Sequence, residues 1–558
     1  MWRPQMKFVL ISACLLVLAQ CAAPIAAQES LIAKTPQGAL RGISVESNVR
    51  AFRGIPYALA PTGERRWQPP VPAPDWQGVR DAAAPGPACM QPQSQNTSVY
   101  SETLEAMSED CLSLNVWAPQ DASKAPVMVW IHGGSLLTGY SGSPFYDGTK
   151  LAGKGVVVVS INYRLGVFGF FAHPELTAES PHNASGNYGL LDQIEALKWV
   201  QRNIASFGGD PENVTIFGES AGALSTMYLL ASPLAEGLFD KAIAESPYMV
   251  PTPELKKSQY GLKSGEEIGL KVAEKLGAEN LKALRAIDAQ TLNAAPIEGG
   301  PIPQATIDGW VLTRQLPETF DAGEQAHVPL MAGFNSGEIR TLLGLLPPVP
   351  DSAAAYETAM RTKYADLAET YLALYPGDDP RESLLAATRD AVYGWSSQRL
   401  ARNQAAIGEL SYVYMFDQSY PAVEALNLTG FHASEIPYVF GVVGDDDQLP
   451  PNWPKPPGDA ENIALSEAMM DYWTSFAKTG EPRAPGQPDW RPFSDNEAYM
   501  IFRHEPQPGQ DLLPGHYDLM EEFACRRRAA NQSWMPLVGV TAPTLPQAAC
   551  ASADADVH

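Results

Sequence analysis

The stretch Val214-Thr-Ile-Phe-Gly-Glu-Ser-Ala-Gly222 is the part of the sequence around which the fold can be built. It begins as an apolar run of β-forming residues, turns at a Gly-x-Ser-x-Gly sequence centred on Ser220, and continues into a helix-compatible segment at 223–230. A serine on such a turn exposes its hydroxyl, and unpaired N–H groups at the helix start lie beside it. The sequence pattern can also arise by chance in a chain with 45 glycines. The strand before it and the helix after it favour a nucleophile at Ser220.

The segments around this turn alternate between strand and helix patterns. Near-continuous apolar runs predict strands covered on both faces, and they lie at 126–131, 155–163, 328–334 and 412–416. Residues 112–117 alternate like a half-buried strand. Residues 187–204 carry apolar side chains at helical spacing. This order predicts an α/β fold with a mainly parallel central sheet.

Further helices and a tail follow from local composition. Residues 256–292 are amphipathic and helix-rich, and a Pro/Gly passage at 296–303 follows, so we expect an insertion over the sheet rather than a separate domain. Residues 464–479 predict a helix that Gly480 ends. From residue 529 onward Ala, Pro, Thr and Asp dominate, which predicts a loosely ordered tail.

The N-terminus has the pattern of a secretory signal. Basic residues precede an apolar run at 8–19 that is too short to span a bilayer, and small residues follow up to Ala27. We therefore expect export to the periplasm or the extracellular space. A lipid anchor at Cys21 is an alternative, although Gln20 is a poor fit to the small residue that such a site requires.

These boundaries divide the chain into a signal peptide at 1–27, one catalytic domain at 28–522 and a C-terminal tail at 523–558. Outside the signal, four cysteines remain: Cys89, Cys111, Cys525 and Cys550. An even number in an exported protein favours disulfides. The pairing of each cysteine with its nearer neighbour is one of three possible pairings, and each such bridge would stabilise the fold by about 3 kcal/mol.

Charge and composition exclude several classes of function. The 558 residues carry a formal net charge of −24 and no Lys/Arg-rich stripe, which argues against nucleic-acid binding. No group of Cys and His has metal-ligand spacing, and we expect no metal and no cofactor.

A nucleophilic serine needs a base and an acid. His432 follows the predicted strand 412–416 late in the chain, and Glu338 directly follows the predicted strand 328–334. The order serine, acid, histidine is the one in which a sheet of this kind delivers such partners. By composition alone a histidine is more often structural or solvent-facing. The rival acids Asp366, Glu369 and Asp390 lie in helical or loop patterns, where we expect solvated side chains.

The chemistry explains why these residue types are needed. A serine hydroxyl becomes a good nucleophile only when an imidazole takes its proton, and an anion must orient that imidazole. The tetrahedral intermediate then needs backbone donors, each worth on the order of 10²–10³ in rate. Gly133-Gly-Ser135 follows a predicted strand and can supply two N–H groups, and Ala221 can supply a third. The alternative is that Gly133 and Gly134 only form a turn.

Several sequence motifs follow one another along the chain between residues 35 and 502. They are Phe52-Arg-Gly-Ile-Pro-Tyr-Ala58, Ser108-Glu-Asp-Cys-Leu-Ser-Leu-Asn-Val116, Asn203-Ile-Ala-Ser-Phe-Gly-Gly-Asp-Pro211 running into the Ser220 turn, the segments 333–338 and 432–441, and Tyr472-Trp-Thr-Ser-Phe-Ala-Lys-Thr-Gly-Glu-Pro482. In these motifs the chain resembles the type-B carboxylesterase/lipase family, which includes cholinesterases and bacterial para-nitrobenzyl esterases.

The resemblance implies an α/β-hydrolase fold, with a large, mostly parallel central sheet flanked by helices and helical insertions over the active site. It implies a catalytic triad of Ser220, Glu338 and His432. It also implies an oxyanion hole formed by Gly134, Ser135 and Ala221. The residues next to the triad would be Gly133, Glu219 and Ser246. One disulfide is implied, between Cys89 and Cys111.

Two positions depart from the family pattern. Ser135 stands where relatives usually have Gly or Ala, so its side chain could narrow the acyl side of the site or donate a hydrogen bond. Ser246 is followed by Pro247, where relatives usually have Gly, so the local backbone could differ.

The expected function is that of a serine esterase that hydrolyses small-molecule carboxylic esters through an acyl-enzyme, with no obligate protein partner. The alternatives are a lipase or polyesterase, an amide or carbamate hydrolase that uses the same site, and a non-catalytic adhesion or scaffold protein on the same fold.

Overall fold

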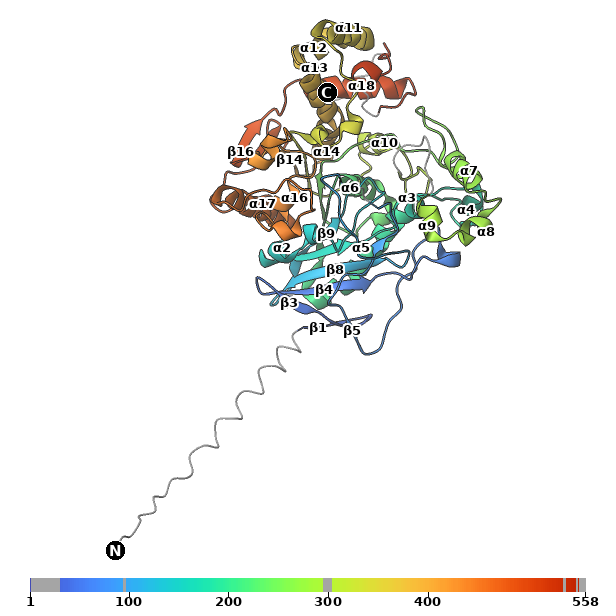
Figure 1. Cartoon of the computed structure of the whole chain (residues 1–558), viewed down its shortest axis with the longest axis vertical. Coiled ribbons are helices and arrows are strands. Elements are labelled where there is room, and N and C mark those ends of the chain that lie inside the picture. The colour runs from blue at the N-terminus through green and yellow to red at the C-terminus, as the bar shows by residue number, and fades with distance from the viewer. Residues whose placement is uncertain (2–30, 94–96, 295–303, 535–537, 548–549, 551–558) are drawn as a thin grey trace.

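The computed structural model describes residues 31–93, 97–294, 304–534 and 538–547, together with Met1 and Cys550. An 11-stranded sheet runs through the molecule and helices cover both of its faces (Figure 1). In spatial order its strands are β16 (Glu505–Gln510), β15 (Ala498–Arg503), β14 (Ser411–Phe416), β13 (Leu330–Asn335), β12 (Lys241–Glu245), β11 (Gly209–Glu219), β9 (Ala125–Ile131), β10 (Val157–Ile161), β8 (Ser113–Pro119), β4 (Val49–Pro56) and β3 (Ile43–Val45).

The strands from β15 to β10 are parallel, and the strands beyond them at both edges are antiparallel. The predicted α/β-hydrolase fold and its mostly parallel sheet are thereby confirmed. Every residue of β10, β13 and β14 is buried, as their continuous apolar runs predict. The prediction of a half-buried strand at 112–117 is wrong. In β8 every residue from Ser113 to Ala118 is buried, because β8 lies inside the sheet between β10 and β4.

Two hydrophobic clusters pack on opposite faces of the sheet. The alternate β9 side chains Val127, Val129 and Ile131 pack with α5 (Tyr188–Asn203) and α6 (Ala221–Ala231). Their neighbours Met128 and Trp130 pack with α16 (Ile436–Val439) and α17 (Ala460–Thr479) on the other face. This alternation is the physical signature of a strand that is covered on both sides.

The remaining helices form two groups outside the sheet. One follows β12 and includes α7 (Gly265–Lys275), α8 (Leu281–Ala286), α9 (Ala289–Asn293) and α10 (Leu316–Asp321). The other gathers at the top of Figure 1 and consists of α11 (Ala353–Tyr364), α12 (Ala368–Leu374), α13 (Pro380–Arg389) and α18 (His516–Ala529), with α14 (Trp395–Ala406) between this group and strands β13 and β14. The structure thus has helices within 256–292, as predicted. The Pro/Gly passage at 296–303 lies outside the described residues.

Short elements complete the chain. A small sheet of β1 (Ile32–Thr35), β2 (Gly38–Arg41) and β5 (Val79–Asp81) lies beside the main one, and β6 (Ala88–Cys89) pairs with β7 (Met107–Ser108). The short helices are α2 (Thr149–Gly153), α3 (Gly166–Gly169), α4 (Pro174–Glu179) and α15 (Pro421–Ala425).

Both disulfides join near neighbours, Cys89 with Cys111 and Cys525 with Cys550, which confirms the local pairing. The tail is better packed than its composition suggests. The Trp534 ring packs against Tyr260 at 4.6 Å between centroids, and the Leu545 N–H donates to the Lys363 carbonyl (2.8 Å). The expected loose tail is therefore corrected for the described residues, and residue 523 lies inside α18.

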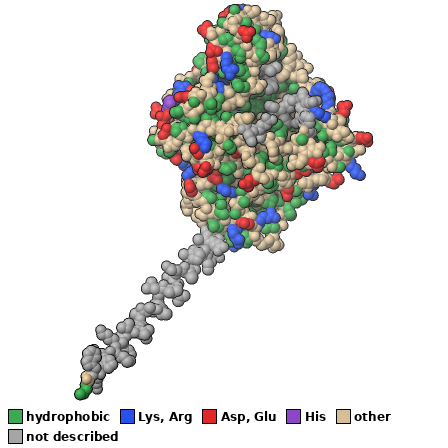
Figure 2. Space-filling model, viewed as in Figure 1, with side chains coloured by type: hydrophobic (Ala, Val, Ile, Leu, Met, Phe, Trp, Pro, Cys, Tyr) green, Lys and Arg blue, Asp and Glu red, His purple; other side chains and the backbone are tan. Residues whose placement is uncertain are grey.

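The segment assigned to a signal peptide, 1–27, lies outside the described residues except for Met1. Among the helices that the structure describes, none is both long and apolar enough to cross a membrane. On the face drawn in Figure 2, acidic and basic side chains are interspersed with hydrophobic ones.

Candidate active site

Ser220 lies on the turn between β11 and α6 with its backbone in an unusual conformation. Its φ is 55° and its ψ is −118°, values that cost a non-glycine residue about 1–3 kcal/mol. The turn is held on both sides, because the Ser220 N–H donates to the Glu245 carbonyl (2.9 Å) and the Ser220 carbonyl accepts from the Leu224 N–H (2.9 Å). The surrounding structure thus maintains a strained turn that presents one serine hydroxyl.

Two glycines let this turn approach the end of β9. A Cβ atom on Gly222 would lie 2.0 Å from the Ile131 carbonyl oxygen, and one on Gly218 would lie 2.5 Å from the same atom. A backbone oxygen inside a sheet cannot retreat as the end of a flexible side chain can. The small residues on either side of Ser220 are therefore required by packing as well as by the bend.

Glu338 and His432 meet from two loops that follow β13 and β14. His432 Nδ1 lies 2.5 Å from Glu338 Oε2. The other carboxylate oxygen, Oε1, accepts hydrogen bonds from the Ser246 hydroxyl (2.6 Å) and from the Asn335 N–H (2.8 Å). These bonds orient a fully buried carboxylate toward Nδ1. They leave Nε2 as the nitrogen free to exchange a proton.

Nε2 of His432 lies close to Glu219, the residue before Ser220. It is 3.1 Å from Glu219 Oε1, an ion-pair distance without hydrogen-bond geometry, since Oε1 has no hydrogen-bond partner among the described residues. Within the described part of the chain, no hydrogen bond joins His432 to the Ser220 hydroxyl, although both side chains line the same cavity. Catalytic hydrogen bonds are often long or misaligned in a ligand-free site and tighten when substrate binds. The nucleophile, base and acid chosen from the sequence are thus brought to one place, with the base close to Glu219, the residue before the nucleophile.

The charges around His432 favour its protonated form. Burial by itself lowers the pKa of His432, but the negative charges of Glu219 and Glu338 outweigh it and raise the pKa to about 9. Burial also raises the pKa of Glu219 to about 7, against the attraction of His432. A protonated imidazole is therefore favoured near neutral pH. Its Nε2–H is attracted more strongly by a carboxylate than by a hydroxyl.

Two further buried glutamates, Glu245 and Glu435, lie beside the site, and neither was predicted from the sequence. Glu245 accepts a hydrogen bond from the Trp473 indole (2.7 Å), and burial raises its pKa to about 8. Burial and the neighbouring glutamates raise the pKa of Glu435 well above its ordinary value. One signal was available for Glu245, because it ends the short strand Lys241–Glu245 directly after the apolar residues Ala242, Ile243 and Ala244. Glu435 lies three residues after His432 in a motif already noted.

The loop that follows β9 packs directly against the Ser220 turn. A Cβ atom on Gly133 would lie 2.8 Å from the Glu219 carbonyl oxygen and 3.2 Å from Ser220 Cβ. Gly134 has a φ of 97° and Ser135 a φ of 60°. Glycine at 133 therefore permits the close approach, and two left-handed residues then turn the loop along the cavity wall.

Backbone N–H groups beside Ser220 have no partner within the protein. Among the described residues, the N–H groups of Gly134, Ser135 and Ala221 make no hydrogen bond. Ala221 is the first residue of the 11-residue helix α6, where the helix dipole adds partial positive charge. Such groups next to a nucleophile can accept developing negative charge.

A cavity of about 620 Å³ opens over Ser220 and His432. Its walls are rich in aromatic side chains, namely Tyr100, Tyr140, Phe145, Tyr146, Tyr248, Tyr393 and Trp453. The carboxylates of Glu102 and Glu219 also line it, and none of the described lining residues is Lys or Arg. A volume of this size can hold a drug-sized molecule. The walls select for apolar and aromatic groups without negative charge.

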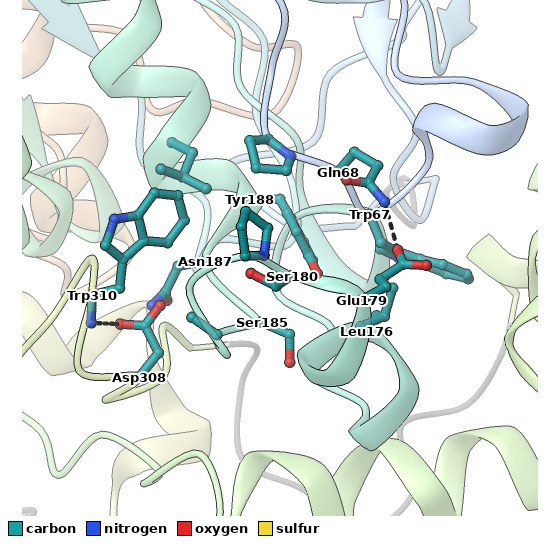
Figure 3. A pocket seen from close by; sticks show the side chains of 14 residues that line it. Trp67, Gln68, Leu176, Glu179, Ser180, Ser185, Asn187, Tyr188, Asp308 and Trp310 are labelled. Atoms are coloured by element: carbon teal, nitrogen blue, oxygen red, sulfur yellow. Dashed lines mark hydrogen bonds between the residues drawn. The ribbon is translucent and has the colours of Figure 1, made fainter.

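A second hollow shown in Figure 3 does not compete with this cavity. It lies between Trp67, Tyr188 and Trp310 and measures about 20 Å³, which is room for about one water molecule. Several of its polar groups are already paired. Gln68 donates to Glu179 (2.5 Å), and the backbone N–H of Trp310 donates to Asp308 (3.0 Å).

The rival acids take other roles. Asp390 was expected to be solvated, but it is buried, where it accepts hydrogen bonds from Arg389 (2.6 Å) and from the Tyr375 hydroxyl (2.9 Å). This corrects the expectation, and the cause is that Asp390 begins a π-helical turn packed between α13 and α14. Asp366 and Glu369 are exposed and pair with arginines. Within the described residues no group of His, Cys, Asp and Glu is arranged to hold a metal ion.

Comparisons with known proteins agree with this geometry. A family model described as the carboxylesterase family matches residues 29–519. The chain is 35% identical over 506 residues to a fumonisin B1 esterase of Sphingopyxis macrogoltabida, covering 89% of this chain and 91% of that protein. It is 37% identical over 467 residues to a para-nitrobenzyl esterase of Bacillus subtilis, covering 81% and 90%. A solved PNB esterase structure aligns with a TM-score of 0.75 at 32% identity, covering 88% of this chain and 99% of that one.

Proposed function

The chain belongs to the carboxylesterase family and hydrolyses carboxylic esters of small molecules, and we propose that Ser220, His432 and Glu338 are its nucleophile, base and acid. One observation carries the assignment. The Glu338–His432 pair (2.5 Å) and the strained Ser220 turn face one cavity beside unpaired backbone N–H groups. Each of these features is costly to maintain, and together they match the requirements of acyl transfer.

In the first half of the reaction, the Ser220 hydroxyl oxygen attacks the ester carbonyl carbon while His432 Nε2 takes the hydroxyl proton. The negative charge moves to the carbonyl oxygen, which the N–H groups of Gly134, Ser135 and Ala221 then bind. The bond to the alcohol oxygen breaks, and His432 returns the proton to that oxygen. Water attacks the resulting acyl-enzyme by the same sequence of steps and releases the acid.

This sequence requires a neutral His432 whose Nε2 comes within hydrogen-bond reach of the Ser220 hydroxyl. In the structure Nε2 lies 3.1 Å from Glu219 Oε1, and the negative charge of Glu219 favours the protonated imidazole, which cannot take the Ser220 proton.

The decisive experiment replaces Ser220 with Ala and measures hydrolysis of a short-chain p-nitrophenyl ester. We expect turnover to fall by several orders of magnitude, to the background of a mock purification. Labelling with a fluorophosphonate should also disappear. Ser225→Ala is a matched control on the same helix, since Ser225 is buried and accepts from Gln193 (3.0 Å) away from the cavity. Retained turnover in Ser220→Ala would exclude Ser220 as the nucleophile.

We further propose that the protein is exported, with a signal at 1–27, a catalytic domain at 28–522 and a tail at 523–558. Two disulfides support export, because such bonds persist in oxidising compartments. Intact mass of the mature protein tests the division. Cleavage near Ala27 gives an unmodified N-terminus, whereas lipidation at Cys21 adds the mass of acyl chains.

A further inference from the structure

Tyr100 reaches the backbone of His432 across the cavity. Its hydroxyl lies 2.9 Å from the His432 carbonyl oxygen and 2.6 Å from Thr341 Oγ1. A carbonyl oxygen can only accept, so Tyr100 donates to His432 and Thr341 donates to Tyr100. Among the described residues, no other group donates to the His432 carbonyl. One hydroxyl therefore supplies the hydrogen bond that holds this peptide.

The two partners of this hydroxyl belong to the segments that carry the acid and the base. Thr341 directly follows the short helix Glu338–Arg340. Tyr100 itself lies between Cys89 and Cys111, which a disulfide joins. Tyr100 thus connects three segments that are distant in sequence at the point where Glu338 meets His432.

The same two segments are also joined on the other side of His432. The Asn335 amide donates to the Phe431 carbonyl (2.8 Å), and the Gly337 N–H donates to the Gly430 carbonyl (2.6 Å). These bonds fix the backbone before His432, whereas the bond from Tyr100 fixes the peptide that follows it. The segment after His432 is also held by the Asn335 amide, which donates to the Glu435 carboxylate, so the particular role of Tyr100 is its bond to the His432 peptide itself.

Ring contacts and charge keep Tyr100 suited to this role. Its ring meets that of His432 edge-to-face at 6.3 Å and that of Trp453 at 6.0 Å. Burial raises the pKa of Tyr100 well above its ordinary value, and nearby glutamates add to this effect although the hydrogen bond with Thr341 opposes it. The hydroxyl therefore keeps its proton and remains a donor over the working range of an esterase.

We propose that Tyr100 is a positioning residue for ester hydrolysis, which ties the His432 loop to the Glu338 segment and so sets how His432 Nε2 reaches Ser220. The inference rests on the proposed roles of Ser220, Glu338 and His432. Tyr100 acts through the His432 backbone, so its contribution belongs to the chemical steps rather than to substrate affinity. Small errors in the position of a catalytic group cost on the order of 10–100-fold in rate.

The test is Tyr100→Phe, which keeps the ring and removes the hydroxyl. We expect kcat to fall about tenfold, with KM changed less than about twofold, and the rate of inactivation by a fluorophosphonate to fall in parallel. Tyr420→Phe is the matched control, because Tyr420 is buried and donates to the Pro454 carbonyl (2.6 Å) but does not line the cavity. It should leave kcat unchanged while shifting the melting temperature similarly.

Thr341→Val provides a second, independent arm. Because Thr341 supports the same hydroxyl, its loss should lower kcat in the same direction. The double variant should cost less than the product of the two single effects, as expected for residues acting as one unit. The proposal would be overturned if Tyr100→Phe changed KM but left kcat unchanged. It would also be overturned if Thr341→Val retained full kcat.

The proposed triad is tested separately by Ser220→Ala. Loss of turnover there with normal kcat in Tyr100→Phe defeats only the role of Tyr100. Retained turnover in Ser220→Ala defeats the triad itself, whatever Tyr100→Phe does.

Discussion

The reactivity of Ser220 depends on where a single proton of His432 resides. Two carboxylates contact the imidazole, Glu338 at Nδ1 (2.5 Å) and Glu219 at Nε2 (3.1 Å). Glu338 holds the imidazole ring in the orientation that a general base requires. Glu219 stabilises the protonated form of the imidazole, which cannot take the Ser220 proton. The activity at neutral pH is therefore set by the balance between these two residues.

Glu219→Gln should shift the pH dependence of kcat/KM. The negative charges around His432 raise its pKa to about 9, and only the neutral imidazole above that pKa can take the Ser220 proton. Removing the charge of Glu219 lowers this pKa, so the rise in kcat/KM with pH should move to lower pH. The measurement is hydrolysis of an uncharged ester from pH 5 to 10.

A suitable control for this shift is Glu105→Gln. Glu105 is exposed and does not line the cavity, and its loss changes the net charge by the same amount. An unshifted profile in Glu219→Gln, or an equal shift in Glu105→Gln, would contradict a direct effect of Glu219 on His432.

At the scale of elements, catalysis depends on how closely α6 follows β11 and how closely both approach β9. The turn at Ser220 brings the start of α6 within contact of the Ile131 carbonyl, and only glycine at 222 permits this. A second element, the π-helical turn Asp390–Gly394, places Tyr393 with its ring 5.2 Å from that of His432. π-Helical turns frequently occur at functional sites.

Gly222→Ala should destabilise the fold rather than only slow the reaction. The added Cβ would lie 2.0 Å from the Ile131 carbonyl oxygen, so either β9 or α6 must shift, at a cost of about 3 kcal/mol or more. Thermal unfolding measures the change. Gly344→Ala is the control, because a Cβ there meets nothing within 4 Å and its φ is not positive. Equal melting temperatures for the two variants would refute the packing argument.

At the scale of the whole molecule, the dominant charge is negative. The chain carries a formal net charge of −24. The cavity is lined by two carboxylates and by His432, and no described lining residue is Lys or Arg. A negatively charged substrate is therefore repelled during its approach to the protein.

We expect an ester with a carboxylate on its acyl chain to be a poorer substrate than its uncharged isostere. At low ionic strength kcat/KM should differ by about tenfold or more, and added salt should narrow the difference, because exposed charges are screened within about 10 Å at 0.1 M. Steady-state kinetics at two salt concentrations measure both effects. Equal kcat/KM for the two esters would show that the cavity charges do not face the substrate.

Much of the architecture and the candidate residues could be predicted from sequence because the signals are local. Apolar runs marked the parallel strands β9, β10, β11, β13 and β14, but not β12 or β15, and the glycines around Ser220 marked the turn. Glu338 follows β13 closely and His432 lies in the longer loop after β14, so the parallel sheet carries both to the same edge. The segment 112–117 was wrongly predicted to be half-buried, whereas β8 is buried on both faces. Alternation of polar and apolar residues describes a single strand and cannot show which faces of the sheet other elements cover.

The sequence by itself determined the order of the catalytic residues along the chain, which is nucleophile, acid and base, each in a segment that follows a strand. It left the pairing of the four cysteines open among three possibilities. Only the tertiary structure decided the disulfides and the contacts around the site. Nε2 of His432 lies 3.1 Å from Glu219, the Tyr100 hydroxyl holds the His432 peptide, and four glutamates lie buried together. Such contacts join residues from 100 to 332 positions apart. Their distances and pKa values depend on burial and charge from several elements at once, which no local pattern encodes.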